Sequence, residues 1–271
     1  MDRYVVIGNP VSHSLSPAIQ NRFAEETGET LEYATLLAPL EDFAGAAARF
    51  FAEGGRGANV TLPFKVDAFQ FAHHGSERAR LAGAANFLAA TGGRVGADNT
   101  DGAGLVADLV DNLGIDLGGA RILLVGAGGA ARGVIAPLLA ARPRRLVLAN
   151  RTAARARELA AQFSSVGVIE AAALEAIPEE DFDLVLNATS TSTHGQTLEL
   201  PARVMRVGSF AYDMAYGPAA RPFLARAAQG RMKTSDGLGM LVEQAAESFR
   251  LWRGKRPATA RILVELRSRF A

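Results

Sequence analysis

The stretch RILLVGAGGAARGV, at Arg121–Val134, reads as a buried strand, a glycine-rich turn and the start of a helix. Gly126 and Gly128 are the glycines of the turn, and Ala131 takes the third small position, which gives the pattern G-x-G-x-x-A. The first glycine permits a tight turn, the second lets a pyrophosphate approach the backbone, and the small third residue lets helix and strand pack closely. Because the N–H groups and positive dipole end of the helix then face the phosphates, the stretch indicates a dinucleotide site of the Rossmann type.

The neighbouring segments help to distinguish such a site from an ordinary glycine-rich connection, because the motif alone is a weak signal. Further strand-like segments follow in close succession at RRLVLAN (144–150), DLVLNATST (183–191) and SFAYDMAY (209–216). Successive βα units of this kind predict a parallel sheet. The dinucleotide interpretation is therefore favoured.

The end of the second strand indicates which dinucleotide binds. NAD enzymes usually place an acidic residue there to bond the ribose 2′-hydroxyl. This chain has Asn150, Arg151 and Thr152 instead, and Arg155 follows one helical turn after Arg151. Two guanidinium groups on one face suit a dianionic 2′-phosphate, although arginines on a helix surface can also be merely solvated, as we expect for Arg157. The pattern favours NADP over NAD.

The first hundred residues also alternate between strand-like and helix-like segments. Strands are expected at 4–8, 31–37, 57–62 and 85–90, and helices that finish at glycine are expected at 16–28 and 40–55. An amphipathic helix is expected to end at Gly114, and residues 237–254 and 259–270 look helical throughout. Together with the second half, this predicts an α/β fold with parallel sheets and a change of pattern near residue 103.

Composition limits the classes of partner. The chain has 271 residues, 49% of them hydrophobic, with 29 Lys and Arg against 28 Asp and Glu. A formal charge of +1 gives no overall field for nucleic acid or an anionic membrane. There is no cysteine, no signal peptide and no apolar run of the roughly 18–20 residues that cross a membrane. We expect a cytoplasmic protein that binds small molecules.

Polar clusters in the first half need an explanation. Ser14 and Ser16 precede Pro17 at a helix start; Ser16 is a good N-cap, and the two hydroxyls would also make a neutral grip for a carboxylate. Lys65, in NVTLPFK (59–65), stands early in a helix, where a cation opposes the dipole and so points to a function.

Two further polar positions and the histidines complete this set. Asn86 interrupts an apolar strand, and Asp101, in NTDG, either caps the next helix or contributes to a site. The four histidines (His13, His73, His74 and His194) lack the spacing of paired metal ligands, so no metal site is predicted. The adjacent His73 and His74 suggest an exposed helix end.

Eight motifs follow one another along the chain: GNPVSHSLSPAIQN (8–21), NVTLPFK (59–65), AANF (84–87), NTDGAG (99–104), GAGGAAR (126–132), NRT (150–152), YDMAY (212–216) and GLGMLVEQAAESFRLWRG (237–254). In this order, over residues 8 to about 254, they resemble the shikimate dehydrogenase family. The resemblance implies reversible, NADPH-dependent reduction of 3-dehydroshikimate to shikimate in the pathway to aromatic amino acids. It also implies an α/β substrate-binding domain (1–103 plus 238–271) and an inserted Rossmann domain (104–237).

The resemblance also implies roles for individual residues. Lys65 and Asp101 match the catalytic pair. The matching substrate-binding residues are Ser14, Ser16, Thr61, Asn86, Tyr216 and Gln244. The matching residues for NADP are Gly126, Ala127, Gly128, Gly129 and Ala130 at the phosphate turn, Asn150, Arg151, Thr152 and Arg155 at the 2′-phosphate, and Thr189, Met214, Gly237 and Met240 at the nicotinamide end.

Three positions depart from the family pattern. Gln20 replaces a usual histidine, Phe87 a usual threonine, and Arg221 a usual small hydroxyl residue. We interpret Gln20 and Arg221 as neutral surface changes, whereas Phe87, beside Asn86, has the potential to reshape the ring-binding pocket.

Two alternatives remain open at this point. The first is a related enzyme that acts on quinate or another cyclic hydroxy acid. The second is a nucleotide sensor without turnover, which the presence of both Lys65 and Asp101 disfavours. We expect a monomer or a homodimer, with hinges at Gly102–Gly104 and Gly237–Gly239.

Overall fold

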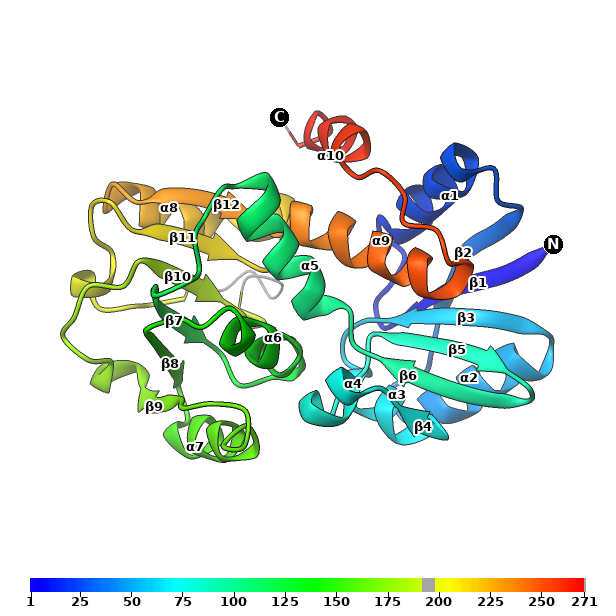
Figure 1. Cartoon of the computed structure of the whole chain (residues 1–271), viewed down its shortest axis with the longest axis horizontal. Coiled ribbons are helices and arrows are strands. Elements are labelled where there is room, and N and C mark those ends of the chain that lie inside the picture. The colour runs from blue at the N-terminus through cyan, green and yellow to red at the C-terminus, as the bar shows by residue number, and fades with distance from the viewer. Residues whose placement is uncertain (192–197, 271) are drawn as a thin grey trace. The chain divides into compact units, whose positions relative to one another are not determined.

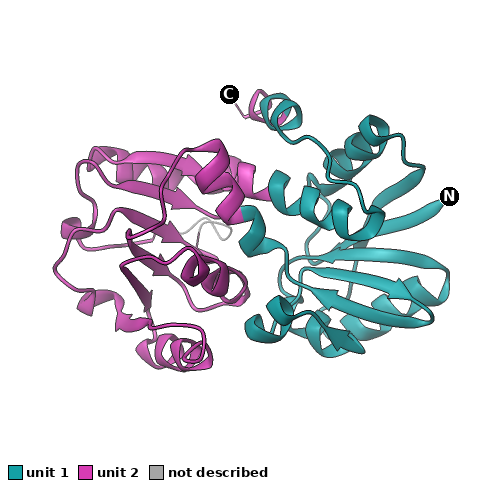
Figure 2. Ribbon diagram, in the orientation of Figure 1, with its two compact units in different colours: residues 1–104, 242–265 teal, residues 105–241, 266–271 magenta. Residues whose placement is uncertain are grey.

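The computed structural model describes residues 1–191 and 198–270 and divides the chain into two compact units, shown in Figure 2. Unit 1 contains residues 1–104 and 242–265, and unit 2 contains residues 105–241 and 266–271. The expected α/β class is confirmed, since each unit holds a six-stranded sheet covered by helices (Figure 1). Whether the parts 1–103 plus 238–271 and 104–237 act as separate substrate and cofactor domains is a functional prediction.

The sheet of unit 1 is mixed and has the strand order β2-β1-β3-β5-β6-β4. Its strands are β1 (Asp2–Gly8), β2 (Leu31–Leu37), β3 (Gly55–Val60), β4 (His74–Gly75), β5 (Phe87–Thr91) and β6 (Arg94–Asp98). Strands β1, β2 and β3 pair in parallel, but β5 runs antiparallel to both β3 and β6. The two-residue turn Gly92–Gly93, with φ of 58° and 76°, joins β5 to β6. Such a turn can only join antiparallel strands, so this sheet is not parallel throughout.

Alternation along β1 gives this sheet its two buried faces. Val5 and Ile7 belong to a core cluster with residues of α2 (Phe43–Ala52) and α3 (Lys65–Phe71). Tyr4 and Val6 belong to another cluster, against which Trp252 packs. Two further helices complete the N-terminal part, α1 (Ser16–Thr27) and α4 (Glu77–Ala82).

The ends of the first helices differ in part from the expectation. Helix α1 ends, as predicted, at a glycine: Gly28 adopts the left-handed conformation with φ of 70°. Its N-cap is Leu15 rather than Ser16, and no side chain caps it. The prediction that Ser16 is the N-cap is wrong, because Ser16 is already the first helical residue. Its backbone N–H donates to Ser14 Oγ at 3.2 Å.

The sheet of unit 2 is parallel at every pairing and has the order β12-β11-β10-β7-β8-β9. Its strands are β7 (Arg121–Val125), β8 (Arg145–Asn150), β9 (Glu170–Ala173), β10 (Leu184–Asn187), β11 (Phe210–Asp213) and β12 (Lys233–Asp236). Counted from β7, this order is 6-5-4-1-2-3, the doubly wound Rossmann arrangement, whose order reverses between β7 and β10. The predicted Rossmann-type fold is confirmed.

The helices of unit 2 include α6 (Gly129–Ala140), α7 (Ala153–Gln162) and α8 (Arg221–Gln229). Short 3-10 turns lie at η2 (Leu174–Ala176), η4 (Ala202–Val204) and η5 (Gly217–Ala219). Three helices contain residues of both units: α5 (Asp101–Ala107), α9 (Leu238–Arg253) and α10 (Ala260–Arg267). Helix α5 continues into a π-helical turn, η1 (Asp108–Asn112), which completes the helix predicted to end at Gly114.

The predicted C-terminal helices are present as α9 and α10. Among the described residues, no helix is long and apolar enough to cross a membrane.

Candidate functional site

Lys65 and Asp101 form a close ion pair in unit 1. Lys65 is the first residue of α3 and Asp101 the first residue of α5, and Lys65 Nζ lies 2.6 Å from Asp101 Oδ2. The side chains are 14% and 6% exposed. The carboxylate therefore offsets the unfavourable position of a cation at a helix start.

The hydrogen bonds of Asp101 bear on its two expected roles. Its Oδ2 accepts from Lys65 and its Oδ1 accepts from Asn86 Nδ2 at 2.8 Å. The backbone N–H of Asp101 donates to Asn99 Oδ1 at 3.1 Å. The side chain of Asn99 thus accepts the first N–H of α5, and the carboxylate of Asp101 bonds the side chains of Lys65 and Asn86.

Asn86 is the centre of a buried polar cluster. Its Nδ2 also lies within donor distance of Thr100 Oγ1, at 2.9 Å, and of Gln244 Oε1, at 3.1 Å. Its Oδ1 accepts the backbone N–H of Thr100 at 2.7 Å. Gln244 comes from α9, 158 positions further along the chain. The structure therefore brings four of the predicted residues, Lys65, Asn86, Asp101 and Gln244, into one hydrogen-bonded group.

Four residues of this cluster were not predicted from the sequence: Tyr33, Asn59, Thr100 and Ser248. Asn59 Nδ2 donates to Ser248 Oγ at 2.9 Å and to the carbonyl oxygen of Asn86 at 3.1 Å. Ser248 Oγ lies 3.2 Å from Thr100 Oγ1, and Tyr33 donates its hydroxyl to Asn59 Oδ1 at 2.7 Å. Two of them could have been found in the sequence as polar residues at otherwise apolar positions: Asn59 in a strand and Ser248 on a helix face.

The remaining predicted substrate residues of unit 1 follow the carboxyl ends of β1 and β3, which are neighbours. Ser14 and Ser16 come after β1, and Ser16 is only 5% exposed. Thr61 follows β3; its methyl group would lie 2.5 Å from a Cβ at Gly8, so it packs directly against the end of β1. Ligands of open α/β sheets bind at this edge.

The three departures from the family pattern have different surroundings. Gln20 is 1% exposed and donates through Nε2 to the carbonyl oxygen of Ala245 at 3.0 Å, so its interpretation as a surface change is wrong. Phe87 stacks on Trp252 with ring centroids 4.9 Å apart, and thus belongs to an aromatic cluster. Arg221 is exposed, as expected.

The glycine turn of unit 2 has the geometry that the motif requires. Gly126 has φ of 116°, and a Cβ there would lie 2.9 Å from the backbone of Ala188, after β10. This contact lies where the strand order reverses. A Cβ at Gly128, by contrast, would meet no atom within 4 Å, which leaves room for a phosphate group. Helix α6 begins at the next residue, Gly129, and Ala131 is fully buried against the sheet. The predicted Ala127 and Ala130 flank Gly128 and Gly129 in this turn.

The predicted 2′-phosphate residues lie at the end of β8 and the start of α7. Asn150 Nδ2 donates to the carbonyl oxygen of Thr152 at 3.0 Å, and Thr152 is the N-cap residue of α7. Arg151 and Arg155 are exposed, and neither forms an ion pair or side-chain hydrogen bond within the described part of the chain. Two uncompensated guanidinium groups, with no acidic residue at the strand end, fit the 2′-phosphate of NADP.

The residues predicted for the nicotinamide end follow β10, β11 and β12. The Oδ1 of Asn187 accepts both the N–H of Thr189 at 3.0 Å and its hydroxyl at 2.7 Å. Asn187 Nδ2 donates to Asp213 Oδ2 at 3.0 Å. Gly237 approaches the end of β11 so closely that a Cβ would lie 2.4 Å from the carbonyl oxygen of Met214. Asn187 and Asp213 are both fully buried and were not predicted from the sequence.

Two other predicted residues also belong to unit 2. Met240 is buried in the first turn of α9. Tyr216 lies beside Phe270, with ring centroids 6.2 Å apart, whereas the other predicted substrate residues belong to unit 1.

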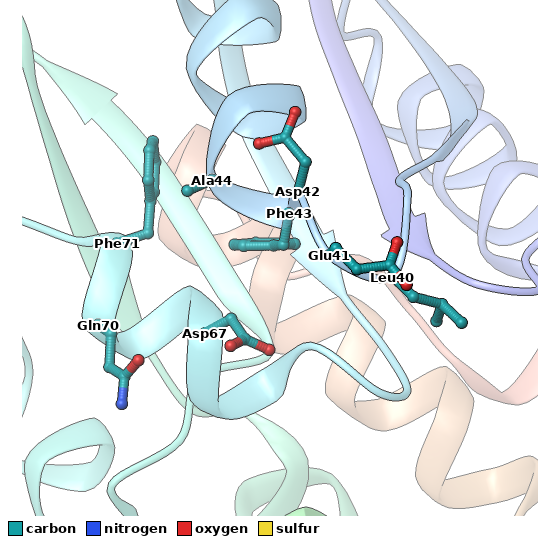
Figure 3. Close-up of a pocket in the computed structure, with 8 residues that line it drawn as sticks. All are labelled: Leu40, Glu41, Asp42, Phe43, Ala44, Asp67, Gln70 and Phe71. Atoms are coloured by element: carbon teal, nitrogen blue, oxygen red, sulfur yellow. The ribbon is translucent and has the colours of Figure 1, made fainter.

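A surface pocket in unit 1 involves none of the predicted residues (Figure 3). It is lined by Leu40, Glu41, Asp42, Phe43, Ala44, Asp67, Gln70 and Phe71. Its three carboxylates oppose the binding of an anion, so it is a poor site for a carboxylate substrate or a phosphate-bearing cofactor.

Histidine, aspartate and glutamate residues form no potential metal site within residues 1–191 and 198–270. His73 and His74 follow the end of α3 and are exposed, although His74 also begins β4. His194 lies outside the described residues.

Comparison with known proteins gives consistent matches along the chain. Family models match as the shikimate dehydrogenase substrate binding domain over residues 6–88, shikimate / quinate 5-dehydrogenase over 108–215, and the shikimate 5′-dehydrogenase C-terminal domain over 237–263. The chain is 53% identical to a shikimate dehydrogenase (NADP(+)) of Acidovorax sp. (strain JS42), over 100% of this chain and 97% of the relative.

Solved structures are similar over nearly the whole length. An Ael1 enzyme from Pseudomonas putida is 45% identical, with a TM-score of 0.91 and 98% of each chain covered. Shikimate 5-dehydrogenase from Thermus thermophilus, in complex with NADP(H) and shikimate, is 33% identical, with a TM-score of 0.85 and 99% of each chain covered.

Proposed function

Because this chain belongs to the shikimate dehydrogenase family, we propose that it catalyses the reversible, NADP-dependent reduction of 3-dehydroshikimate to shikimate. This is a reaction of the route to aromatic amino acids and chorismate. The observation that carries the proposal is the Lys65–Asp101 ion pair, which is largely shielded from water and bonds Asn86, in a chain whose strand β8 ends without an acidic residue.

Lys65 and Asp101 are the proposed catalytic residues. Bound NADPH supplies the hydride that reduces the carbonyl carbon. The Lys65 ammonium supplies the proton that the carbonyl oxygen takes up, and in the reverse direction the amine accepts it. Asp101, 2.6 Å from Lys65 Nζ, holds the ammonium in place. Positioned acid–base groups of this kind contribute roughly 10²–10⁴ in rate.

The substrate is held by neutral polar groups of unit 1. Ser14 and Ser16 offer hydroxyls to its carboxylate, and Thr61, Asn86 and Gln244 bond its ring hydroxyls. Asn86 and Gln244 are 3% and 8% exposed, so a ring hydroxyl that bonds them lies in a site largely shielded from water. Sites of this type discriminate strongly. Tyr216 is a further residue proposed to bind the substrate.

The proposed cofactor residues all belong to unit 2. The turn from Gly126 to Ala130 holds the pyrophosphate, while Asn150, Arg151, Thr152 and Arg155 hold the 2′-phosphate. Thr189, Met214, Gly237 and Met240 surround the nicotinamide. The fit rests on the open space at Gly128 and on the two exposed arginines, which have no protein partners among the described residues.

Initial rates with shikimate and quinate, each with NADP⁺ and NAD⁺, test this function. We expect turnover of shikimate with NADP⁺ and much slower turnover in the other three combinations. Faster turnover of quinate would instead identify a quinate dehydrogenase, a possibility that the description of the matching family model also names. Binding of NADPH without turnover of either acid would identify a sensor.

The cytoplasmic location and the monomeric or dimeric state remain proposals from the sequence. Cell fractionation checks the first, and size-exclusion chromatography with light scattering checks the second.

A further inference from the structure

Asp108 is a carboxylate buried inside unit 2 that none of the proposed functions uses. It opens the π-helical turn η1 after α5 and is 0% exposed. Burying a carboxylate is costly unless hydrogen bonds compensate it. Its donors include the hydroxyl of Tyr212, at 2.6 Å from Oδ2, and Asn112 Nδ2, at 3.0 Å from Oδ1.

The same carboxylate lies directly against the first turn of α9. A Cβ at Gly239 would be 1.9 Å from Asp108 Oδ1 and 2.3 Å from its Cγ. Position 239 therefore has no room for a side chain while the carboxylate stays in place. A negative charge at a helix start is favourable, because it faces the positive end of the helix dipole.

Through these contacts Asp108 joins two elements that carry proposed nicotinamide residues. Tyr212 is in β11, two positions before Met214. Gly239 lies between Gly237 and Met240 at the start of α9. The N–H of Gly237 also donates to the carbonyl oxygen of Ala215 at 2.9 Å, so the start of α9 is held against the end of β11 at two points.

Tyr212 is suited to be a permanent donor in this arrangement. Burial, followed by the nearby carboxylate of Asp108, raises the pKa of its hydroxyl well above 10. The phenol therefore stays protonated at neutral pH, and its bond to Asp108 persists.

We propose that Asp108 is a positioning residue for hydride transfer, which fixes the first turn of α9 to β11 and so sets the place of Met214, Gly237 and Met240 at the nicotinamide. This inference rests on the proposed function for those three residues. It assigns no contact between Asp108 and the substrate or the cofactor.

The test separates the two ends of the cofactor. NADPH engages the whole proposed site, whereas adenosine 2′,5′-bisphosphate has the 2′-phosphate but no nicotinamide. For Asp108→Ala we expect kcat to fall about tenfold and NADPH to bind about threefold more weakly, because a slightly misplaced nicotinamide reacts more slowly. Binding of the bisphosphate, followed by calorimetry, should stay unchanged. Asp108→Asn keeps an oxygen for Tyr212 and should recover most of kcat.

Two further variants keep the proposal testable if Asp108→Ala fails to fold. Tyr212→Phe removes only the hydroxyl and should lower kcat about threefold, in line with one lost hydrogen bond. Gly239→Ala must displace the carboxylate, so it should reproduce the Asp108→Ala losses, and the double variant Asp108→Ala/Gly239→Ala should lose little more. Asp111→Ala removes an exposed carboxylate from the same turn and serves as the control.

The proposal is overturned if Asp108→Ala or its substitutes lower thermal stability while kcat and NADPH affinity stay at the wild-type level. It is also overturned if NADPH and the bisphosphate weaken equally, because the damage would then be general to unit 2. Failure of the wild type to oxidise shikimate would reject the proposed function instead, and the comparison of the two ligands would still test Asp108.

Discussion

The two units present their proposed functional groups in opposite ways. In unit 1 the groups already bond one another: Lys65 to Asp101, Asp101 to Asn86, and Asn86 to Gln244. In unit 2 Arg151 and Arg155 are exposed, with no partner among the described residues. A buried network depends on each of its members, whereas exposed charges act separately and are screened by salt. The units should therefore respond differently to substitution.

Asp101→Asn should give the largest effect, because it removes the counter-charge of Lys65 from a buried cluster. We expect kcat to fall by roughly 10²–10⁴, the usual contribution of a positioned acid–base group. Initial rates at saturating shikimate and NADP⁺ measure this. Asp67→Asn removes an exposed carboxylate in the same first turn as Lys65 and should leave kcat unchanged. Equal losses in both variants would contradict a specific role for Asp101.

Arg151→Ala tests the exposed arginines of unit 2. Loss of a charge-assisted bond should weaken NADPH by about 1.5–3 kcal/mol and leave NADH use nearly unchanged. The loss should shrink as salt is raised, because the site is exposed. KM values for both cofactors at two salt concentrations measure it, with the exposed Arg157→Ala on α7 as the control. Equal losses with NADPH and NADH would mean that Arg151 has a structural role.

Ser248→Ala tests whether the wider network of unit 1 supports the substrate residues. Ser248 is 0% exposed and bonds Asn59 and the backbone of Gln244. Its loss should lower the free energy of unfolding by about 1 kcal/mol and raise the KM for shikimate several-fold, while the KM for NADP⁺ stays unchanged. Chemical denaturation and steady-state kinetics check the two parts. A rise in the KM for NADP⁺ alone would contradict the assignment of this network to the substrate.

The smallest predicted effect concerns acid stability of unit 1. The hydrogen bond from Arg250 is the main cause that lowers the pKa of Glu247 below 4.5, with Arg78 adding to it and burial opposing it. Burial by itself raises the pKa of Asp98, but the bonds from Arg78 and Ser76 outweigh it, and the net shift is downward. The unfolded chain then binds more protons than the folded one, so this stability is present above the unfolded pKa values and is lost as pH falls through the folded ones.

We therefore expect the free energy of unfolding to fall between about pH 5 and about pH 3. In Glu247→Gln, the fall in the free energy of unfolding should be smaller than in the wild type by about 0.5–1 kcal/mol, which is the usual contribution of a partly exposed ion pair. Urea unfolding across this range measures it, with the exposed Glu77→Gln as the control. The same pH dependence in wild type and Glu247→Gln would show that this carboxylate does not contribute.

Features of unit 2 were accessible from the sequence because they are local. The turn at Gly126, the absence of an acidic residue after β8 and the succession of βα units are all contained in short segments. In unit 1 the only local signal for the hairpin formed by β5 and β6 is the pair of glycines at 92 and 93, and the sequence analysis does not predict this hairpin. A two-residue turn changes the direction of a strand without changing its hydrophobic pattern.

Residues that act through distant partners were the least predictable. Asn59 and Ser248 are 189 positions apart, and Asp108 and Tyr212 are 104 positions apart. Gln20 donates to a backbone oxygen 225 positions away, and the sequence alone does not reveal that this partner buries it. Such pairs leave no periodicity in the sequence, and only the fold brings them together.

The most direct test of the account is Lys65→Ala, with catalysis and binding measured separately. If the Lys65–Asp101 pair performs the chemistry while the other polar groups of unit 1 hold the substrate, kcat should fall by roughly 10²–10⁴. Calorimetry should still detect binding of shikimate to the variant. A wild-type rate in the variant would contradict the account.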